Sequence, residues 1–180
     1  MKRTVAKLCL VALVLVAPVV LAEGFKVISE VLTGYQEVPA VSTTGNGQFR
    51  ARISNDEQSI QWELDYADLE GSVQQSHIHI GQPGVNGGIS VFLCTNLGNG
   101  PAGTQLCPAP PAHISGTILA ADVSPNIPAT NNARVQGLGT GEIAELIKAI
   151  RAGATYVNIH TTTWPGGEVR KQINGNAGSN

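Results

Sequence analysis

The sequence predicts a mainly β protein: an antiparallel Greek-key or immunoglobulin-like β-sandwich or barrel of about eight strands with one amphipathic helix. Two observations favour this fold class. Short runs in which apolar and polar residues alternate recur along most of the chain, separated by turns rich in glycine and proline. A single segment shows the residue spacing of a helix instead.

The clearest strands form a predicted hairpin. Apolar residues alternate over 49–53 and again over 60–66, and the polar turn 54–57 lies between them. Similar alternation predicts six further strands, at 26–32, 74–80, 88–94, 114–121, 155–160 and 168–173.

The predicted helix follows Thr140, which we expect to be its N-cap. Its apolar residues recur at i, i+3, i+4 and i+7, at positions Ile143, Leu146, Ile147 and Ile150. Gly153 is typical of the end of a helix. We expect one amphipathic helix packed on the sheet, preceded by a long connection over 122–139.

The first 22 residues have the layout of a cleavable secretory signal. Three basic residues precede an apolar run from Leu8 to Leu21, which closes on Ala22. This run is shorter than the roughly 20 apolar residues of a membrane anchor, and Pro18 interrupts it. We therefore expect a signal peptide at 1–22, one β domain at 23–173 and a disordered tail at 174–180. The mature protein is predicted to be secreted or periplasmic, without a stable membrane span.

The net charge of the mature chain limits the classes of binding partner that we expect. Of the 11 basic residues, cleavage after 22 removes three, and it removes none of the 13 acidic ones, so 8 basic residues remain and the net charge becomes −5. An acidic surface disfavours nucleic acid and anionic membranes as partners. The partner we expect is an extracellular or envelope ligand of unknown identity.

Cleavage also leaves two of the three cysteines, Cys94 and Cys107. Thiols oxidise in the compartments that receive exported proteins, so we predict that these two form a disulfide. The segment between them is rich in glycine, asparagine and proline, and it is expected to be a surface loop tethered by the bridge.

Two segments carry the most informative side chains. In each, a histidine follows an isoleucine near the end of a predicted strand, at His79 and at His160, and a Pro-Gly turn with further glycine comes next. We interpret them as two strand-loop-strand units in equivalent roles.

His77 lies on the same strand as His79. Their side chains project to one face and Ile78 to the other, so with Ile78 in the core the two imidazoles face outward or into a cleft. His160 would supply a third nitrogen, and imidazole-rich sites suit copper or zinc. Two alternatives stay open: the rings donate N–H groups to loop carbonyls and hold the turns in place, or they take part in catalysis.

The His-x-His strand is locally similar to that of the copper-zinc superoxide dismutases, which are also exported β-barrels. The chain has no evident counterpart of their bridging histidine and aspartate set, and His113 is the one spare histidine.

Three ordered motifs resemble the CHRD (chordin-type) domain family over residues 25–173. They span 32–41, then 77–79 with 81–88, then 156–161 with 165–170. Structural roles are expected for the motif residues Gly81, Pro83, Gly84, Asn86, Gly87, Asn158, Pro165, Gly166, Gly167, Glu168 and Arg170. The turns are predicted to need glycine for positive φ. Glu168 and Arg170 share a strand face and are predicted to form an ion pair or network.

The resemblance implies a compact immunoglobulin-like or Greek-key β-barrel. It does not imply the growth-factor antagonism of chordin, whose ligand binding is attributed mainly to other modules. The insert with Cys94 and Cys107 departs from the usual short domain, as does Lys171, where a glycine is common.

No catalytic residues are assigned, since the chain contains no Gly-x-Ser-x-Gly elbow. The leading hypothesis is a non-enzymatic structural, adhesion or ligand-binding module outside the cytoplasm. The rival is a copper or zinc protein that uses His77, His79 and His160, as a metal carrier or a superoxide-dismutase-like redox protein.

Overall fold

The computed structural model describes residues 27–125 and 132–175, and these form a mainly antiparallel β structure. The eight strands are β1 (Val27–Thr33), β2 (Asn46–Ile53), β3 (Ile60–Ala67), β4 (Val73–Ile80), β5 (Ile89–Thr95), β6 (Ala112–Ile118), β7 (Thr155–Thr161) and β8 (Val169–Ile173). Each overlaps a strand predicted from alternation, with ends that differ by a few residues. The predicted signal peptide and residues 176–180 of the predicted tail lie outside the described residues.

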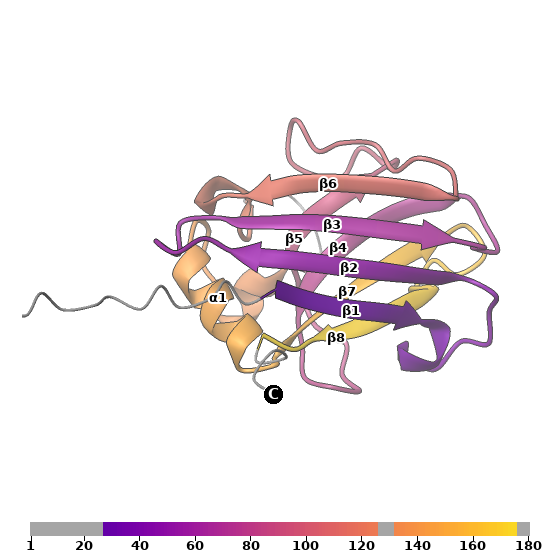
Figure 1. The fold of residues 1–180 in the computed structure, drawn as a ribbon, viewed down its shortest axis with the longest axis horizontal. Coiled ribbons are helices and arrows are strands. Elements are labelled where there is room, and N and C mark those ends of the chain that lie inside the picture. The colour runs from indigo at the N-terminus through magenta and orange to yellow at the C-terminus, as the bar shows by residue number, and fades with distance from the viewer. Residues whose placement is uncertain (1–26, 126–131, 176–180) are drawn as a thin grey trace, which may run out of the picture.

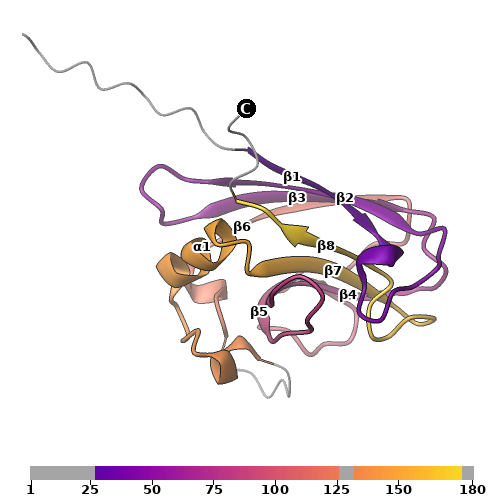
Figure 2. The ribbon, with the colours of Figure 1, turned by 90° about the horizontal axis from the view of Figure 1, so that it is seen from below.

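All eight strands belong to one sheet, in the order β5-β4-β7-β8-β1-β2-β3-β6. The sheet curls into a nearly closed barrel, so that β1, β2, β3 and β6 face β4, β5 and β7 (Figures 1 and 2). Every strand pair is antiparallel, and β1 meets β8 through one paired position, Thr33 with Arg170. The fold class predicted from the sequence is confirmed.

The apolar core lies inside the curl. Alternation places every second side chain of each strand there because successive residues of a strand point to opposite faces. The largest fully buried apolar side chains are Phe49, Ile28, Leu32, Ile60, Leu64, Ile78, Leu93, Ile118, Leu146, Ile147 and Ile150.

The segment between the two edge strands closes the seam of the barrel. The side-chain amide of Gln105 donates to the carbonyl of Leu93 in β5 and to that of Ser115 in β6, each at 3.2 Å. The predicted disulfide is present: Cys94 at the end of β5 is bonded to Cys107 in this segment. The disulfide thus ties this segment to β5, and Gln105 links the two edge strands, which do not pair directly.

The helix α1 (Ile143–Arg151) packs against one end of the barrel (Figure 1). The predicted apolar residues are the ones it buries, and Gly153 follows it with φ of +66°. The N-cap prediction was wrong. Glu142 occupies the N-cap position, and its side chain makes no capping hydrogen bond. The hydroxyl of Thr140 donates instead to the Ser124 carbonyl at 2.7 Å.

Three short 3-10 helices complete the described structure: η1 (Gly34–Gln36), η2 (Ala120–Asp122) and η3 (Ala133–Gln136). The last two lie in and beside the predicted long connection, of which 126–131 is outside the described residues. Within the described ranges, no helix has the length and apolar character needed to cross a membrane.

Candidate metal centre

Three histidines gather on the outer face of β4 and β7. The core-facing residues of these strands include Ile78 and Ile159, so the alternate positions point away from the core. His77 and His79 occupy such positions on β4, and His160 does so on β7. The two strands are paired antiparallel, which brings side chains more than 80 residues apart in sequence together.

Loops cover this outer face. The chain from 81 to 88, here the 81–88 loop, and the turn after β7 both fold back over the imidazoles. As a result the exposed fraction is 1% for His77, 3% for His79 and 8% for His160. One nitrogen from each ring can be chosen so that all three lie within 4.8 Å of one another.

His79 and His160 make the same pair of contacts. Nδ1 of His79 lies 2.9 Å from the carbonyl oxygen of Gly87, and Nδ1 of His160 lies 3.0 Å from that of Pro165. A carbonyl only accepts, so each Nδ1 carries the proton and donates it. Both Nε2 atoms lie 3.1 Å from Oδ1 of Asn158. The equivalence of the two histidine segments inferred from sequence is thus present in their hydrogen bonding.

Gly87 explains why the 81–88 loop can reach His79. A Cβ at this position would collide with the backbone carbonyl of Ile80, so no larger residue allows the approach. The sequence prediction of positive φ in these turns holds for Gly84 and Gly167, at +74° and +128°. It was wrong for Gly87, where close approach of the backbone is the reason for glycine instead.

Burial lowers the pKa of all three imidazoles because the charged form loses its hydration. The pKa of His79 falls to about 3, and burial, opposed in part by its bond to Gly87, is the main cause. Burial also places the pKa of His77 well below its ordinary value and lowers that of His160. All three rings are therefore neutral at physiological pH, the form that binds metals.

The side-chain oxygen of Asn158 lies between the neutral rings of His79 and His160. Its Nδ2 donates to Oε1 of Glu37 at 3.3 Å, which turns Oδ1 toward Nε2 of His79 and of His160. Each Nε2 bears a lone pair, since the ring proton is on Nδ1. Three lone-pair-bearing atoms thus converge where a cation would be stabilised.

His77 differs from the other two histidines. Neither of its ring nitrogens has a hydrogen-bond partner, although the side chain is fully buried. Its neighbours are rings: Phe92 with centroids 4.5 Å apart, His160 at 5.2 Å and His79 at 5.3 Å. Buried polar atoms without partners are rare in folded proteins, so this one requires an explanation.

The profile of the CHRD domain matches residues 28–173, which is most of the chain. This chain belongs to the CHRD domain family. No curated protein and no solved structure gives a significant match to it.

The other motif residues of this CHRD domain hold the loops over the histidines. Arg170 donates to Oδ1 of Asn86 at 2.9 Å and to the Val85 carbonyl at 2.8 Å, and its guanidinium lies 3.4 Å from the ring centroid of Tyr156. Tyr156 in turn stacks on His79, with centroids 4.6 Å apart. The side chain of Arg170 therefore fastens the 81–88 loop to β8.

Glu168 and Arg170 belong to separate networks, and the salt bridges of the described residues do not include a direct pair between them. The carboxylate of Glu168 accepts from the hydroxyls of Thr43 and Thr161, each at 2.7 Å, and from the Glu70 backbone N–H. The structure therefore does not join Glu168 and Arg170 in the predicted ion pair or in one shared network.

Sequence reasoning assigned no role to Glu37, Tyr156 or Phe92. Tyr156 carried a signal, because it alternates with Asn158 and His160 on one strand face. Glu37 lies within the motif at 32–41, but no local pattern predicts its contact with Asn158, which spans 121 residues. The spare His113 lies apart from the cluster, bonded to Asp65 at 2.8 Å on the paired strands β3 and β6.

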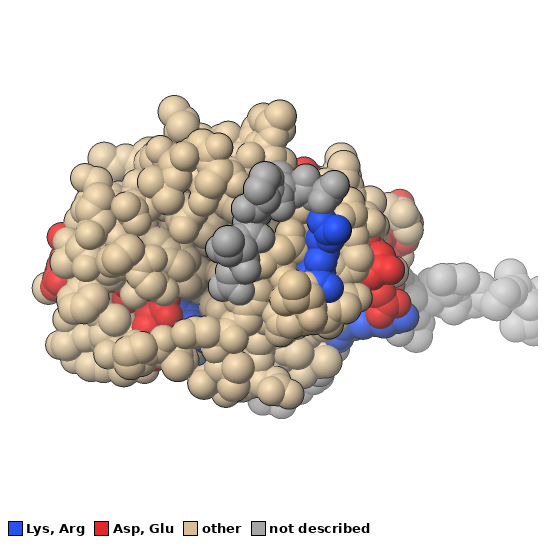
Figure 3. Space-filling view, turned by 180° about the vertical axis from the view of Figure 1, so that it is seen from behind, with Lys and Arg blue, Asp and Glu red and all other residues tan. Residues whose placement is uncertain are grey.

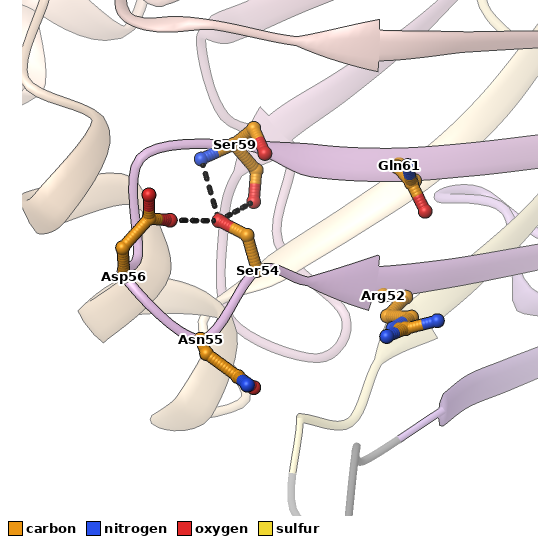
Figure 4. Close-up of a pocket in the computed structure, with 6 residues that line it drawn as sticks. All are labelled: Arg52, Ser54, Asn55, Asp56, Ser59 and Gln61. Atoms are coloured by element: carbon orange, nitrogen blue, oxygen red, sulfur yellow. Dashed lines mark hydrogen bonds between the residues drawn. The ribbon is translucent and has the colours of Figure 1, made fainter.

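A hollow at the turn between β2 and β3 contains none of the three histidines (Figure 4). Hydrogen bonds within the turn engage three of its lining residues: the hydroxyl of Ser54 donates to Asp56 and accepts from the backbone N–H of Ser59. This arrangement stabilises the hairpin and offers no convergent donor set.

Proposed function

We propose that this CHRD domain is an exported, non-enzymatic metal-binding protein that holds one copper or zinc ion between His77, His79 and His160. The observation that carries the proposal is the environment of His77, buried beside two other imidazoles with both ring nitrogens unpartnered. A bound cation would take the lone pair of the unprotonated ring nitrogen of His77.

The alternative, a purely structural set of histidines, accounts for two of the three rings. His79 and His160 each donate to a loop carbonyl, as that hypothesis requires. His77 bonds to no loop, and leaving a buried polar atom unpaired costs about 1–3 kcal/mol. An apolar residue would fill the same space without that cost, which supports a ligand role for His77.

The loop bonds also suit a metal site. Histidine ligands commonly donate their second ring N–H to a carbonyl, which fixes the tautomer and aims the other nitrogen at the metal. Here Nδ1 of His79 and of His160 is held in this way. Metal–nitrogen bonds of about 2.0–2.1 Å require the rings to move inward by roughly 1 Å from the present spacing.

Burial favours holding a metal over catalysis on a substrate. Each of the three rings is less than a tenth exposed, so a substrate could not reach the ion without displacement of the covering loops. A carrier or storage role fits this environment better than a redox enzyme does. Secretion or a periplasmic location is part of the proposal, and the disulfide supports it. The structural and adhesion hypotheses remain predictions.

The test is metal analysis of the purified mature protein after loading with copper or zinc and gel filtration. We expect one ion per chain in the wild type and none in His77→Phe, which preserves packing against Phe92. His113→Phe is the matched control, because His113 lies outside the cluster, and should bind one ion. Absence of stoichiometric copper and zinc from the wild type would reject the proposal.

A further inference from the structure

Resting on the proposed metal centre, we infer that its ion is monovalent copper, and that the site discriminates against zinc because it presents a buried set of uncharged donors. The three imidazoles are neutral ligands. The fourth convergent atom, Oδ1 of Asn158, is an amide oxygen and also neutral. A bound ion would therefore keep its full charge in a region shielded from water.

The nearby carboxylates do not face the histidines. Glu37 reaches the cluster only through the amide of Asn158. Glu168 is occupied by Thr43, Thr161 and the Glu70 backbone. Among the described residues, the group of side chains suited to a metal consists of three histidines, with no acidic member. The donor set thus offers no negative charge to offset a dication.

A fixed positive charge lies close by instead. The guanidinium of Arg170 is 3.4 Å from the ring centroid of Tyr156, and that ring stacks on His79. The hydrogen bonds of Arg170 go to the neutral groups of Asn86 and Val85, and Glu37 interacts with its charge without a hydrogen bond. The face of the molecule on the side of β4 and β7 is also largely uncharged (Figure 3). Repulsion from Arg170 is twice as large for a dication as for a monocation.

The cost of removing the ion from water also favours a monovalent ion over a divalent one. The cost of moving an ion from water into a medium of low dielectric constant rises with the square of its charge, so it is fourfold larger for Zn²⁺ than for Cu⁺. Zinc in proteins is usually tetrahedral with cysteine, histidine or carboxylate ligands, and the fourth convergent atom here is the amide oxygen of Asn158, which is not among them. Cu⁺ is a closed-shell ion that is stable with three nitrogen donors, and imidazole is among its ligands. A dry three-histidine site therefore matches Cu⁺.

The experiment compares the two ions on the full mature protein. Cu⁺, kept reduced by ascorbate without oxygen, is titrated against a chromogenic Cu⁺ chelator, and Zn²⁺ against a zinc indicator. Thiol reductants are left out because they compete for Cu⁺ and reduce the disulfide. We expect Cu⁺ to bind at one ion per chain with a dissociation constant at least about 100-fold below that of Zn²⁺.

The variant Asn158→Asp, made together with Glu37→Gln so that the new carboxylate does not face a second carboxyl, tests the charge argument. It keeps the shape of the side chain but places a carboxylate 3.1 Å from Nε2 of both His79 and His160. We expect the ratio of Zn²⁺ affinity to Cu⁺ affinity to rise by about tenfold or more. Circular dichroism and retained Cu⁺ stoichiometry check that the variant is folded, and the wild-type comparison decides the inference without it.

The outcomes separate the two proposals. Tight Cu⁺ with weak Zn²⁺ supports both. Zinc affinity equal to or above that of Cu⁺ overturns this inference and leaves the metal centre in place. Binding of neither ion overturns the proposed function itself. An unchanged affinity ratio in folded Asn158→Asp with Glu37→Gln shows that donor charge does not set the selectivity.

Discussion

His77 and His79 are two residues apart on β4 and face the same way, yet their surroundings differ. His79 donates to the Gly87 carbonyl, whereas neither ring nitrogen of His77 has a hydrogen-bond partner. Both are buried and neutral, so both oppose protonation of the native state. At the scale of single residues, the site therefore makes the fold sensitive to acid.

The metal-free protein should lose stability as the pH falls below about 6.5. The unfolded chain takes up protons on its histidines there, while the native chain holds them neutral, so the unfolded state binds more protons and the free energy of unfolding decreases. His77 and His79 should each contribute a slope of about 1.4 kcal/mol per pH unit. The contribution of His79 persists toward its native pKa of about 3, and that of His77 persists well below the ordinary pKa of histidine. Urea denaturation between about pH 7 and pH 5 measures this slope.

One variant isolates the origin of that slope. His77→Phe should reduce it by the contribution of one proton. Glu37 has the opposite effect on the slope. Burial raises its pKa in the native state, so its contribution to the free energy of unfolding increases as the pH falls. Equal slopes in the wild type and His77→Phe would contradict the assignment.

At the scale of elements, the open seam between β5 and β6 is the place where closure depends on something other than strand pairing. The disulfide and the side chain of Gln105 supply that connection. On the other side of the barrel, the 81–88 loop and β8 are joined through Arg170. These contacts fix the positions of the segment between β5 and β6 and of the 81–88 loop, which the alternation pattern does not predict.

Removal of the disulfide by Cys94→Ala with Cys107→Ala should lower the free energy of unfolding by about 3 kcal/mol, because a short loop is no longer closed in the unfolded chain. Hydrogen exchange should accelerate first in β5 and β6, the strands that border the seam. Urea denaturation and exchange measured by mass spectrometry check the two parts. Unchanged protection in these strands would show that Gln105 and the core suffice to hold the seam.

At the scale of the whole molecule, the barrel separates two environments. Its inside is an apolar core, and the outer face of β4 and β7 carries a second buried layer of polar side chains under loops. Metal binding to that layer would stabilise the native state as a whole, since an unfolded chain does not hold three separated histidines together.

A metal ion bound at this site should therefore raise the free energy of unfolding by about 2.7 kcal/mol when its free concentration is about 100 times the dissociation constant. The increase should appear in the wild type and be absent in His77→Phe. Denaturation with and without Cu⁺ measures it. An equal increase in both proteins would place the ion elsewhere.

The sequence by itself determined the strands, the helix and the disulfide, because alternation, helical spacing and cysteine count are local properties of the chain. It also assigned His77 and His79 to one strand face and paired the roles of His79 and His160. Alternation says which side chains share a face, but not whether water reaches that face.

Only the tertiary structure decided the environment of the histidines. The 81–88 loop and the turn after β7 contact His79 and His160, and Glu37 orients Asn158 beside them from 121 residues away in sequence. The missing partner of His77 is likewise a property of the folded surroundings. Such contacts arise from how the sheet curls and the loops fold back, which no short-range pattern encodes.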